Sequence, residues 1–448
     1  MTVSLGIDFG TSGARLVAID TDRNVLWRGT RELSAGQWRE TLFNLIQAIP
    51  VAVKSRVNRI AIDGTSSTVL LCDAQGQIIG TPILYYDDRG KTVIDRLRSI
   101  APAGHPAISA TSSLAKLFWL MSQPHVAGTD RYFLHQADWL AYHLHGKLGI
   151  SDYHNALKLG YDVELLCYPD WLERHPYRPL LPQVLKPGTP IGTVLPQVAR
   201  KLGLADDCLV CAGTTDSIAA FIASGVQTPG AAVTSLGSTL VIKLLSHKRV
   251  DEVKHGIYSH RLGDLWLVGG ASNTGGAVLR HFFSDAELVS LSQEIDPSQP
   301  SDLNYYPLLT PGDRFPINDP DLAPRLIPRP DRDVDFLHGL FTGIARIEAH
   351  GYQLLAQLGA TPLTAVSTAG GGAQNPVWTK IRQQYLPVQL SSTDREAAYG
   401  AAVLAQGDRP DLSPPSPPAT APLCLVSLNP RETLTPNPSP KLGQQGWG

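Results

Sequence analysis

Short apolar runs that end in clusters of glycine, serine and threonine recur along this chain and constrain its fold more than any other feature. The first run, Val3 to Asp8, leads into a Gly-rich turn at residues 9–14 and then into a second apolar run, Leu16 to Ile19. Two apolar runs joined by a Gly-containing turn are typical of a β-hairpin. We therefore expect a hairpin whose tip carries Asp8 and the small residues after it.

Four later segments repeat this pattern, and each joins a strand to a second strand or to a helix. Strands are expected at 59–63 and 69–72 around the turn 64–68, and at 232–236 and 240–245 around the turn 237–239. A strand at 208–212 is expected to lead through the turn 213–217 into a helix at 218–224. A further strand at 365–369 is expected before the turn 370–375. An Ala-rich helix is expected from Glu396 to Gln406. Such units occur both before and after about residue 220, which predicts two α/β lobes.

Composition excludes several classes of protein. The 38 Lys and Arg nearly balance the 40 Asp and Glu, so no basic surplus indicates a nucleic acid or an anionic membrane as partner. No apolar run reaches the roughly 18 residues of a membrane span, and Asp8 interrupts the N-terminus before a signal peptide could form. Five cysteines in 448 residues are not a disulfide framework, so we expect a cytoplasmic protein. Ten of the 35 prolines lie in residues 408–448, which predicts an extended, mostly disordered tail there.

The small-residue turns have a chemical interpretation. Backbone N–H groups in a turn of Gly, Ser and Thr can all point at one anion, because no bulky side chain intervenes. Several such turns in one chain indicate a polyphosphate, and a carboxylate beside such a turn, as at Asp8, is expected to recruit Mg²⁺. Asp8 could instead simply cap its own turn. A P-loop and a GxGxxG fingerprint are both absent, which disfavours a Walker-type ATPase and a Rossmann dehydrogenase.

In their order along the chain, these motifs resemble the FGGY carbohydrate kinases. The residues that carry the resemblance are Asp8-Phe9-Gly10-Thr11-Ser12, Asp63-Gly64-Thr65-Ser66, Gly213-Thr214-Thr215-Asp216, Ser235 to Thr239 and Ala369 to Gly372. Within the family, Thr111 to Lys116 and Ser151 to Lys158 look most like the compact D-ribulose (pentulose) kinases and xylulose kinase-like proteins. The resemblance implies the two-lobe actin/Hsp70-like (ribonuclease H-like) ATPase fold, with ATP and sugar in the cleft between the lobes. It implies an N-terminal lobe at 1–222 and a nucleotide-binding lobe at 223–407, followed by the tail at 408–448.

The resemblance also implies roles for single residues. Asp216 would be the general base, with Asp8 and Thr11 assisting catalysis and Asp8 and Asp216 as candidate Mg²⁺ ligands. The ATP-binding residues would be Gly10, Thr11, Ser12 and Gly13 on one lobe and Gly237, Ser238, Thr239, Gly371, Gly372, Asn375 and Trp378 on the other. Asp216 could equally cap the helix that follows it, and Asn375 and Trp378 could cap a helix and pack in a core.

The expected sugar contacts are Asp8, Ser66, Asp152, Tyr153, Asp216 and Ser217. Tyr153 could instead pack between a helix and a loop. Tyr86, with Asp88 and Arg89, occupies a segment where many family members carry Trp, so the contribution of this loop to sugar choice is left open.

We expect an ATP- and Mg²⁺-dependent kinase that phosphorylates the terminal hydroxyl of a ketopentose. The first choice of substrate is D-ribulose, which would give D-ribulose 5-phosphate. D-xylulose is the alternative acceptor, with glycerol or another polyol further off. Two other classes remain: an actin/Hsp70-type ATPase switch without a sugar acceptor, and a sugar-binding module with a decayed site. The expected partners are small molecules, with the protein a monomer or a homodimer.

Overall fold

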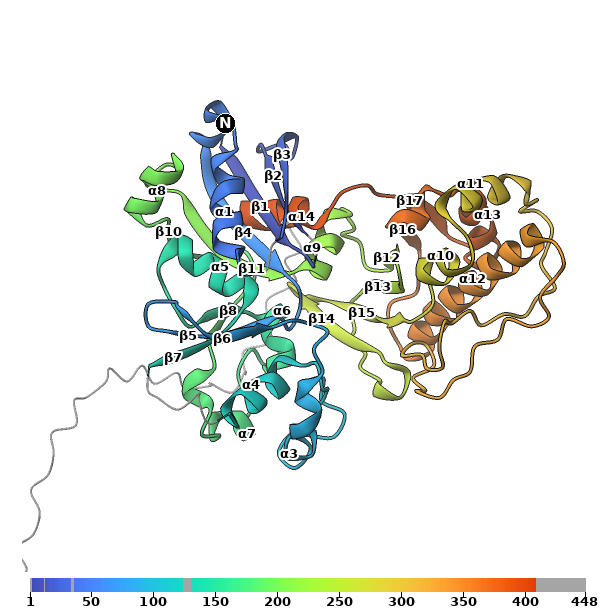
Figure 1. Cartoon of the computed structure of the whole chain (residues 1–448), viewed down its shortest axis with the longest axis horizontal. Helices are drawn as coiled ribbons and strands as arrows, with labels where there is room; N and C mark the ends of the chain where they lie inside the picture. Colours follow the sequence, from blue (N-terminus) through green and yellow to red (C-terminus); the bar gives the residue numbers. More distant parts are fainter. Residues whose placement is uncertain (1, 12, 34–35, 124–129, 408–448) are drawn as a thin grey trace, which may run out of the picture. The chain divides into compact units, whose positions relative to one another are not determined.

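The computed structural model describes residues 2–11, 13–33, 36–123 and 130–407. Ser12 of the predicted phosphate turn and the expected Pro-rich tail lie outside these residues. The first half of the chain builds one six-stranded sheet and the second half another (Figure 1). None of the described helices is both long and apolar enough to cross a bilayer.

The first sheet has the strand order β10-β11-β4-β1-β2-β3. Its strands are β1 (Val3–Phe9), β2 (Gly13–Ile19), β3 (Val25–Glu32), β4 (Val57–Gly64), β10 (Pro190–Thr193) and β11 (Leu209–Thr215). β1 pairs antiparallel with β2 and parallel with β4, and β4 pairs parallel with β11. All seven residues of β1 are buried, as expected of a strand covered on both faces.

The second sheet has the order β14-β15-β13-β12-β16-β17. Its strands are β12 (Ala231–Leu236), β13 (Leu240–Ser246), β14 (Tyr258–Leu262), β15 (Leu265–Ser272), β16 (Ala365–Ala369) and β17 (Gln389–Ser392). The antiparallel run β15-β13-β12 continues into the parallel strands β16 and β17, just as β3-β2-β1 continues into β4 and β11. This repeated topology confirms the prediction of two similar α/β halves.

Two small sheets and the helices complete the described chain. The small sheets contain β5 (Val69–Asp73), β6 (Ile78–Ile83), β7 (Arg131–His135), β8 (Ile150–Asp152) and β9 (Gln183–Leu185). The helices of the first half are α1 (Trp38–Gln47), α2 (Val51–Lys54), α3 (Ile94–Arg98), α4 (Ser113–Met121), α5 (Gln136–His145), α6 (Tyr153–Ala156), α7 (Asp170–Glu173), α8 (Pro196–Leu202) and α9 (Asp216–Ala223). Those of the second half are α10 (Gly276–Phe282), α11 (Asp285–Glu294), α12 (Asp333–Gln357), α13 (Pro376–Tyr385) and α14 (Ala397–Gln406).

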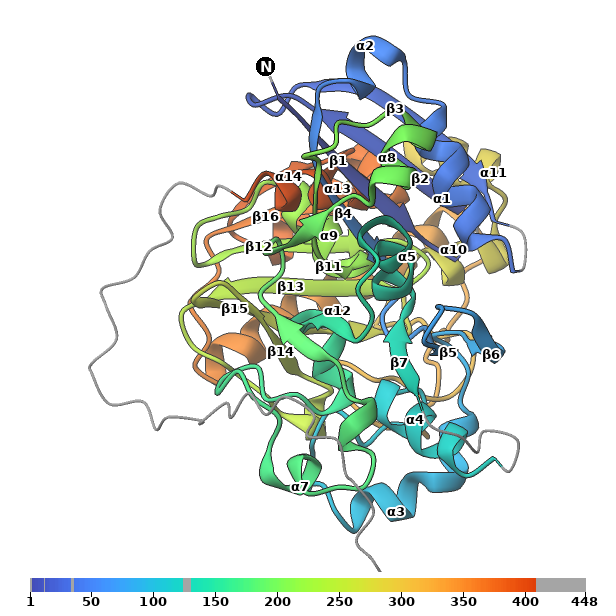
Figure 2. The ribbon, with the colours of Figure 1, turned by 90° about the vertical axis from the view of Figure 1, so that its left-hand side faces the viewer.

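The last helix within the described residues, α14, packs against β1. Figure 1 shows it, in red, beside β1 and α9 and away from α13, and Figure 2 shows it beside β1 from another side. Two glycines allow this approach. A β-carbon at Gly6 would lie 2.0 Å from the carbonyl oxygen of Ala398, and one at Gly400 would lie 1.8 Å from that of Ala219. Neither gap could hold a methyl group, so both contacts depend on glycine.

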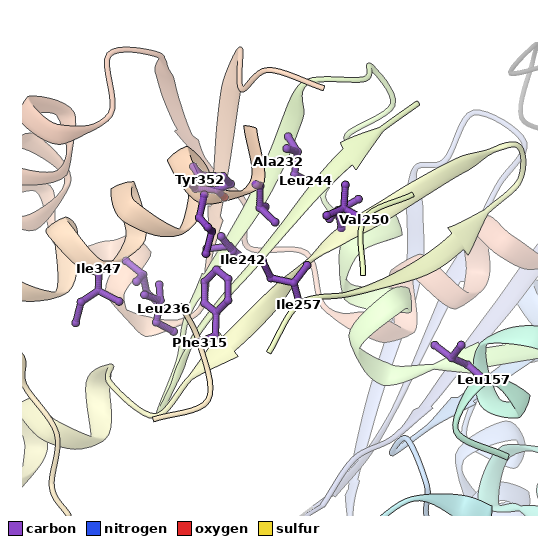
Figure 3. Packing of buried hydrophobic residues seen from close by; sticks show 14 of the residues in the cluster. Leu157, Ala232, Leu236, Ile242, Leu244, Val250, Ile257, Phe315, Ile347 and Tyr352 are labelled. Carbon is purple, nitrogen blue, oxygen red and sulfur yellow. The ribbon is translucent and has the colours of Figure 1, made fainter. Parts of the chain in front are cut away.

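The core of the second half lies between its sheet and α12 (Figure 3). Phe315 is fully buried there beside Ile242 of β13. An ion pair is buried in the same layer: Arg382 donates from Nε and Nη2 to the two carboxylate oxygens of Glu348, both at 2.7 Å. Thr234 of β12 donates to Glu348 and Thr368 of β16 accepts from Arg382, so this ion pair joins the two strands that lead into the Gly237 and Gly371 turns.

Candidate active site

Three carboxyl groups lie at the ends of three neighbouring strands of the first sheet. Asp8 of β1 is in register with Asp63 of β4, and Asp63 is in register with Thr214 of β11, two residues before Asp216. All three strands are parallel, so their carboxyl ends meet at one edge of the sheet, which is where α/β proteins place their ligands. The structure therefore brings Asp8 and Asp216 together, and places between them a carboxyl group that we did not include among the site residues.

Asp8 is held in place by an arginine. Its side chain is 4% exposed, and one carboxylate oxygen accepts a hydrogen bond from Arg15 at 3.0 Å. Arg15 also forms an ion pair with Glu396, immediately before α14. Burial raises the pKa of Asp8 above its ordinary value, although Asp63 and Arg15 act in the opposite direction. Its other carboxylate oxygen faces Gly10, 3.9 Å from the place where a β-carbon would stand.

Asp63 is fully buried, no N–H or hydroxyl group of the described residues donates to its carboxyl oxygens, and its hydrogen-bonding neighbour is the Asp8 carboxylate. Burial, followed by the negative charges of Asp8 and Asp216, raises its pKa well above the ordinary value. Such surroundings favour the protonated form of the carboxyl group over the charged form. The sequence contained a signal for it, because the motif Asp63-Gly64-Thr65-Ser66 aligns with the hairpin tip once β4 is paired with β1.

Asp216 is the first residue of α9, and Thr215 occupies the N-cap position. One Asp216 oxygen accepts the Ser217 N–H at 2.7 Å. Burial, and then the charge of Asp8, raise the pKa of Asp216 to about 6, while Lys243 and Lys158 lower it. A carboxylate with a pKa in this range is a better proton acceptor than an ordinary one.

Lys243 and Lys158 were not among the predicted site residues. Lys243 comes from β13 of the second sheet, and its ammonium group donates to the carbonyl oxygen of Ser217 at 2.5 Å. Lys158 follows α6, and its ammonium group lies 5.8 Å from the centre of the Tyr258 ring. Both positive charges act on Asp216, so the candidate base is flanked by lysines from both halves of the chain.

The two hairpin tips that we expected to hold phosphates are open. A β-carbon at Gly10 would have no atom closer than 3.4 Å, and one at Gly237 none closer than 3.9 Å, and neither glycine has a positive φ. The protein itself therefore does not require glycine at these positions, whereas a phosphate lying against the backbone would. Gly13 begins β2, and Thr11 is exposed at the same tip. On the other tip, the Ser238 hydroxyl accepts a hydrogen bond from Arg280 at 3.1 Å, and Thr239 leads into β13.

A cavity of about 340 Å³ adjoins the second tip. Gly371, Gly372, Asn375 and Trp378 all line it, as the prediction of an adenosine pocket requires. A β-carbon at Gly371 would meet nothing within 4 Å, so this position too has room for a ligand. Trp378 stacks on Phe341 with ring centroids 4.8 Å apart.

The amide of Asn375 is already engaged. Its oxygen accepts from the Trp378 N–H at 2.9 Å and its nitrogen donates to Ser292 at 2.8 Å. The structure thus shows the helix-capping role that the sequence left open, and a direct bond from this amide to adenosine finds no support in the geometry.

A second cavity, of about 590 Å³, lies beside the first tip. Its walls include aromatic rings and hydroxyl groups, the combination that carbohydrate sites use. They belong to Thr11, Trp38, Thr65, Thr68, Tyr85, Tyr86 and Trp139, among others. The segment with Tyr86 therefore lies next to the site, although Asp216 and Ser217 line neither of these two cavities.

The turn after β4 carries two serines. Ser66 is half-buried; Ser67, which we did not predict, has a φ of 65° and a buried hydroxyl group without a partner. Lys116 holds this turn: its fully buried ammonium group donates to the carbonyl oxygens of Ser67, Leu84 and Tyr85.

Asp152 and Tyr153 do not reach an open site. Asp152 is fully buried, and its carboxylate caps α6 by accepting from the N–H groups of His154 and Asn155. Tyr153 is 4% exposed, and its hydroxyl accepts from the Gly263 N–H at 3.4 Å. In this structure Asp152 caps α6 and Tyr153 packs against the turn after β14, so the two predicted sugar contacts stay proposals that the observed geometry does not favour.

No group of three or more His, Cys, Asp or Glu side chains among the described residues could by itself hold a metal ion. This does not conflict with Mg²⁺, which commonly binds through one or two carboxylates, waters and the phosphates of its nucleotide. The Asp8 carboxylate oxygen that faces Gly10 suits such an ion, which would neutralise phosphate charge when bound.

Two matched sheets, two hairpin tips with room beside Gly10 and Gly237, and a carboxylate at the end of β11 suit a nucleotide-dependent phosphotransferase. The chain belongs to the FGGY family of carbohydrate kinases: the model of the N-terminal domain of that family matches residues 3–223, and the model of the C-terminal domain matches residues 232–406. It is an ATP-dependent sugar kinase.

Several relatives show how far this likeness extends. A xylulose kinase of Staphylococcus epidermidis is 24% identical over 443 residues, covering 90% of this chain and 87% of its own. A ribulokinase of Halalkalibacterium halodurans is also 24% identical but covers 55% of this chain and 53% of its own. Solved structures of a xylulose kinase from Rhodospirillum rubrum (TM-score 0.78, 20% identity, 92% and 91% of the two chains) and of Plasmodium falciparum glycerol kinase with ADP (0.77, 16%, 90% and 89%) share the fold.

Proposed function

We propose that the enzyme transfers the γ-phosphoryl group of MgATP to the terminal hydroxyl of a ketopentose, with D-xylulose ahead of D-ribulose. This order reverses the sequence-based expectation. A relative that matches nine-tenths of the chain is named a xylulose kinase, whereas the ribulokinase matches little more than half. Both sugars have the same terminal hydroxyl, so the chemistry of the site is the same for either.

Asp216 carries this proposal. Its place at the end of β11, with a pKa raised to about 6, suits a group that orients the sugar hydroxyl and accepts its proton late in the transfer. The Gly10 and Gly237 tips would hold the phosphates from the two sides, Gly371 and Gly372 the adenosine, and Asp8 the Mg²⁺. Ser66, Ser67 and Ser217 would contact the sugar. We assign residues 1–222 to the sugar and phosphates, and residues 223–407 to the nucleotide.

The experiment is a coupled ADP-release assay over a panel of ketoses and polyols. We expect the highest kcat/KM with D-xylulose and a loss of about 10²–10⁴ in kcat in Asp216→Asn, with ATP binding retained. The exposed Asp206→Asn is the matched control. ATP hydrolysis that needs no sugar and is unaffected by Asp216→Asn would instead indicate a nucleotide-driven switch, and glycerol as the best acceptor would contradict the ketopentose.

A further inference from the structure

His154 makes two hydrogen bonds that join the two halves of the chain. Its Nδ1 lies 2.7 Å from the hydroxyl oxygen of Thr214, near the end of β11, and its Nε2 lies 2.6 Å from the carbonyl oxygen of Arg261 on β14. The side chain is 2% exposed. No motif interpretation gave this residue a role.

The two partners fix the tautomer of the ring. A carbonyl oxygen can only accept, so Nε2 must carry the proton and donate it to Arg261. Nδ1 is then an acceptor, and the Thr214 hydroxyl donates to it. Burial lowers the pKa of His154 to about 3, so the ring is neutral and both bonds persist at physiological pH.

The pairing of β11 shows why such an anchor matters. Its register with β4 shifts between Cys211 and Thr214, at a β-bulge just before the strand reaches Thr215 and Asp216. A bulge breaks the regular backbone ladder and turns the side chains beyond it. The ladder alone therefore holds the end of β11 less firmly than its start, and the bond from Thr214 to His154 adds a fixed point two residues before the candidate base.

The other contacts of this segment point the same way. Tyr153 contacts the backbone of Gly263, and the His154 ring lies 6.4 Å from that of His260 on β14. Arg261 in turn donates to the carbonyl oxygens of Val163 and Glu164. Segment 153–164 of the first half is thus joined to the β14 hairpin of the second.

We propose that His154 is a positioning residue for phosphoryl transfer: through Thr214 it holds Asp216, and through Arg261 it ties that strand end to the sheet whose Gly237 tip faces the phosphates. This inference rests on the proposed function, because the His154 ring is inferred to align the candidate base Asp216 with the phosphates of ATP. A displacement of about 1 Å in such an alignment can cost 10²-fold in rate.

The test is a double-mutant cycle. In His154→Gln the amide nitrogen stands near the place of Nε2, so the bond to Arg261 survives and the acceptor for Thr214 is lost. Thr214→Val removes the hydroxyl at nearly constant volume. We expect each variant to lower kcat for the ketose by about tenfold or more, with KM for ATP changed less than about twofold. The double variant should lose about as much as the more strongly impaired single variant, because both changes remove the same bond.

Thr214→Ser, which keeps the hydroxyl, should recover most of the activity, and the exposed His247→Gln should behave like the wild type. Unchanged kcat in folded His154→Gln and Thr214→Val, or losses that multiply in the double variant, would overturn the proposal. Should His154→Gln fail to fold, Thr214→Val against Thr214→Ser decides the matter. If the wild type phosphorylates no ketose or polyol, the proposed function fails. The bond between His154 and Thr214 is then tested by the free energies of unfolding of the two single variants and the double variant. Losses of stability that add in the double variant would refute the bond.

Discussion

Asp8 and Asp63 occupy matching positions on two adjacent parallel strands, so two carboxyl groups are buried side by side at the edge of the first sheet. Two such groups cannot both ionise without a large penalty, and burial together with the charge of Asp8 raises the pKa of Asp63 well above its ordinary value. The pair therefore favours a single negative charge, on the Asp8 carboxylate that Arg15 holds.

Replacing Asp63 by asparagine should raise stability at alkaline pH. A carboxyl group whose pKa is higher in the folded than in the unfolded protein stabilises the fold at low pH, and this contribution is lost as the pH rises through the folded-state pKa. Asparagine does not titrate, so Asp63→Asn should be more stable than the wild type at pH 8, with the difference shrinking towards pH 4. Urea unfolding at both pH values measures this. A difference that is constant with pH would contradict it.

The rate of the enzyme should fall on the acid side. The general base must be ionised, and burial raises the pKa of Asp216 to about 6. We therefore expect kcat/KM for the sugar to drop about tenfold per pH unit below that value and to level off above it. A pH–rate profile from pH 4.5 to 8 tests this, with ATP kept saturating. A profile that stays flat down to pH 4.5 would remove Asp216 from the role of base.

Alanine at Gly237 or Gly371 should affect nucleotide binding and leave the fold intact. In the protein alone a β-carbon fits at both positions, so the melting temperature should stay close to that of the wild type. A methyl group there would displace a phosphate or the adenosine, and KM for ATP should rise about tenfold or more, by the roughly 1.4 kcal/mol that a tenfold change represents. Titration with ATP and thermal unfolding give both values. An unchanged KM for ATP would place the nucleotide elsewhere.

Removing one partner of the buried pair Glu348 and Arg382 should strongly destabilise the protein. Both side chains are at most 1% exposed, so removing one partner leaves an uncompensated buried charge. We expect Arg382→Met to lower the free energy of unfolding by about 3–5 kcal/mol, and Glu348→Leu combined with Arg382→Met to recover much of that loss. Chemical denaturation of the single and double variants checks both values. Equal losses in the single and double variants would show that packing, not charge, dominates here.

Local patterns were enough to predict the central strands of both sheets. The strands expected at 59–63, 232–236 and 365–369 are present as β4, β12 and β16, and the helix expected at 218–224 is α9. These segments succeed because each is a short apolar run bounded by glycine, so that a local pattern sets both its type and its ends.

The remaining parts of the site depend on pairing between distant segments. Asp63 matters because β4 is in register with β1, and His154 because α6 lies against β11 and β14; no single window of sequence contains either relationship. Asp152 and Tyr153 show the converse. Their residue types suit a sugar contact, but Asp152 caps the helix that follows it, and the Tyr153 hydroxyl contacts a turn more than 100 residues away in the sequence. Asn375 has the right side chain in the predicted pocket, yet the start of α13 uses its amide.

The contact between Gly6 and Ala398 has a consequence for how the protein is made. β1 is made well before α14, so one face of this strand stays uncovered until the segment that forms α14 has been synthesised. Until residue 406 has been synthesised, α14 cannot pack on the first sheet. The apolar side chains that it covers then stay exposed to solvent. Fragments that end near residue 222 lack α14, so we expect them to bind chaperones or to aggregate. Co-expression with the second half supplies α14, which can then pack on the first sheet.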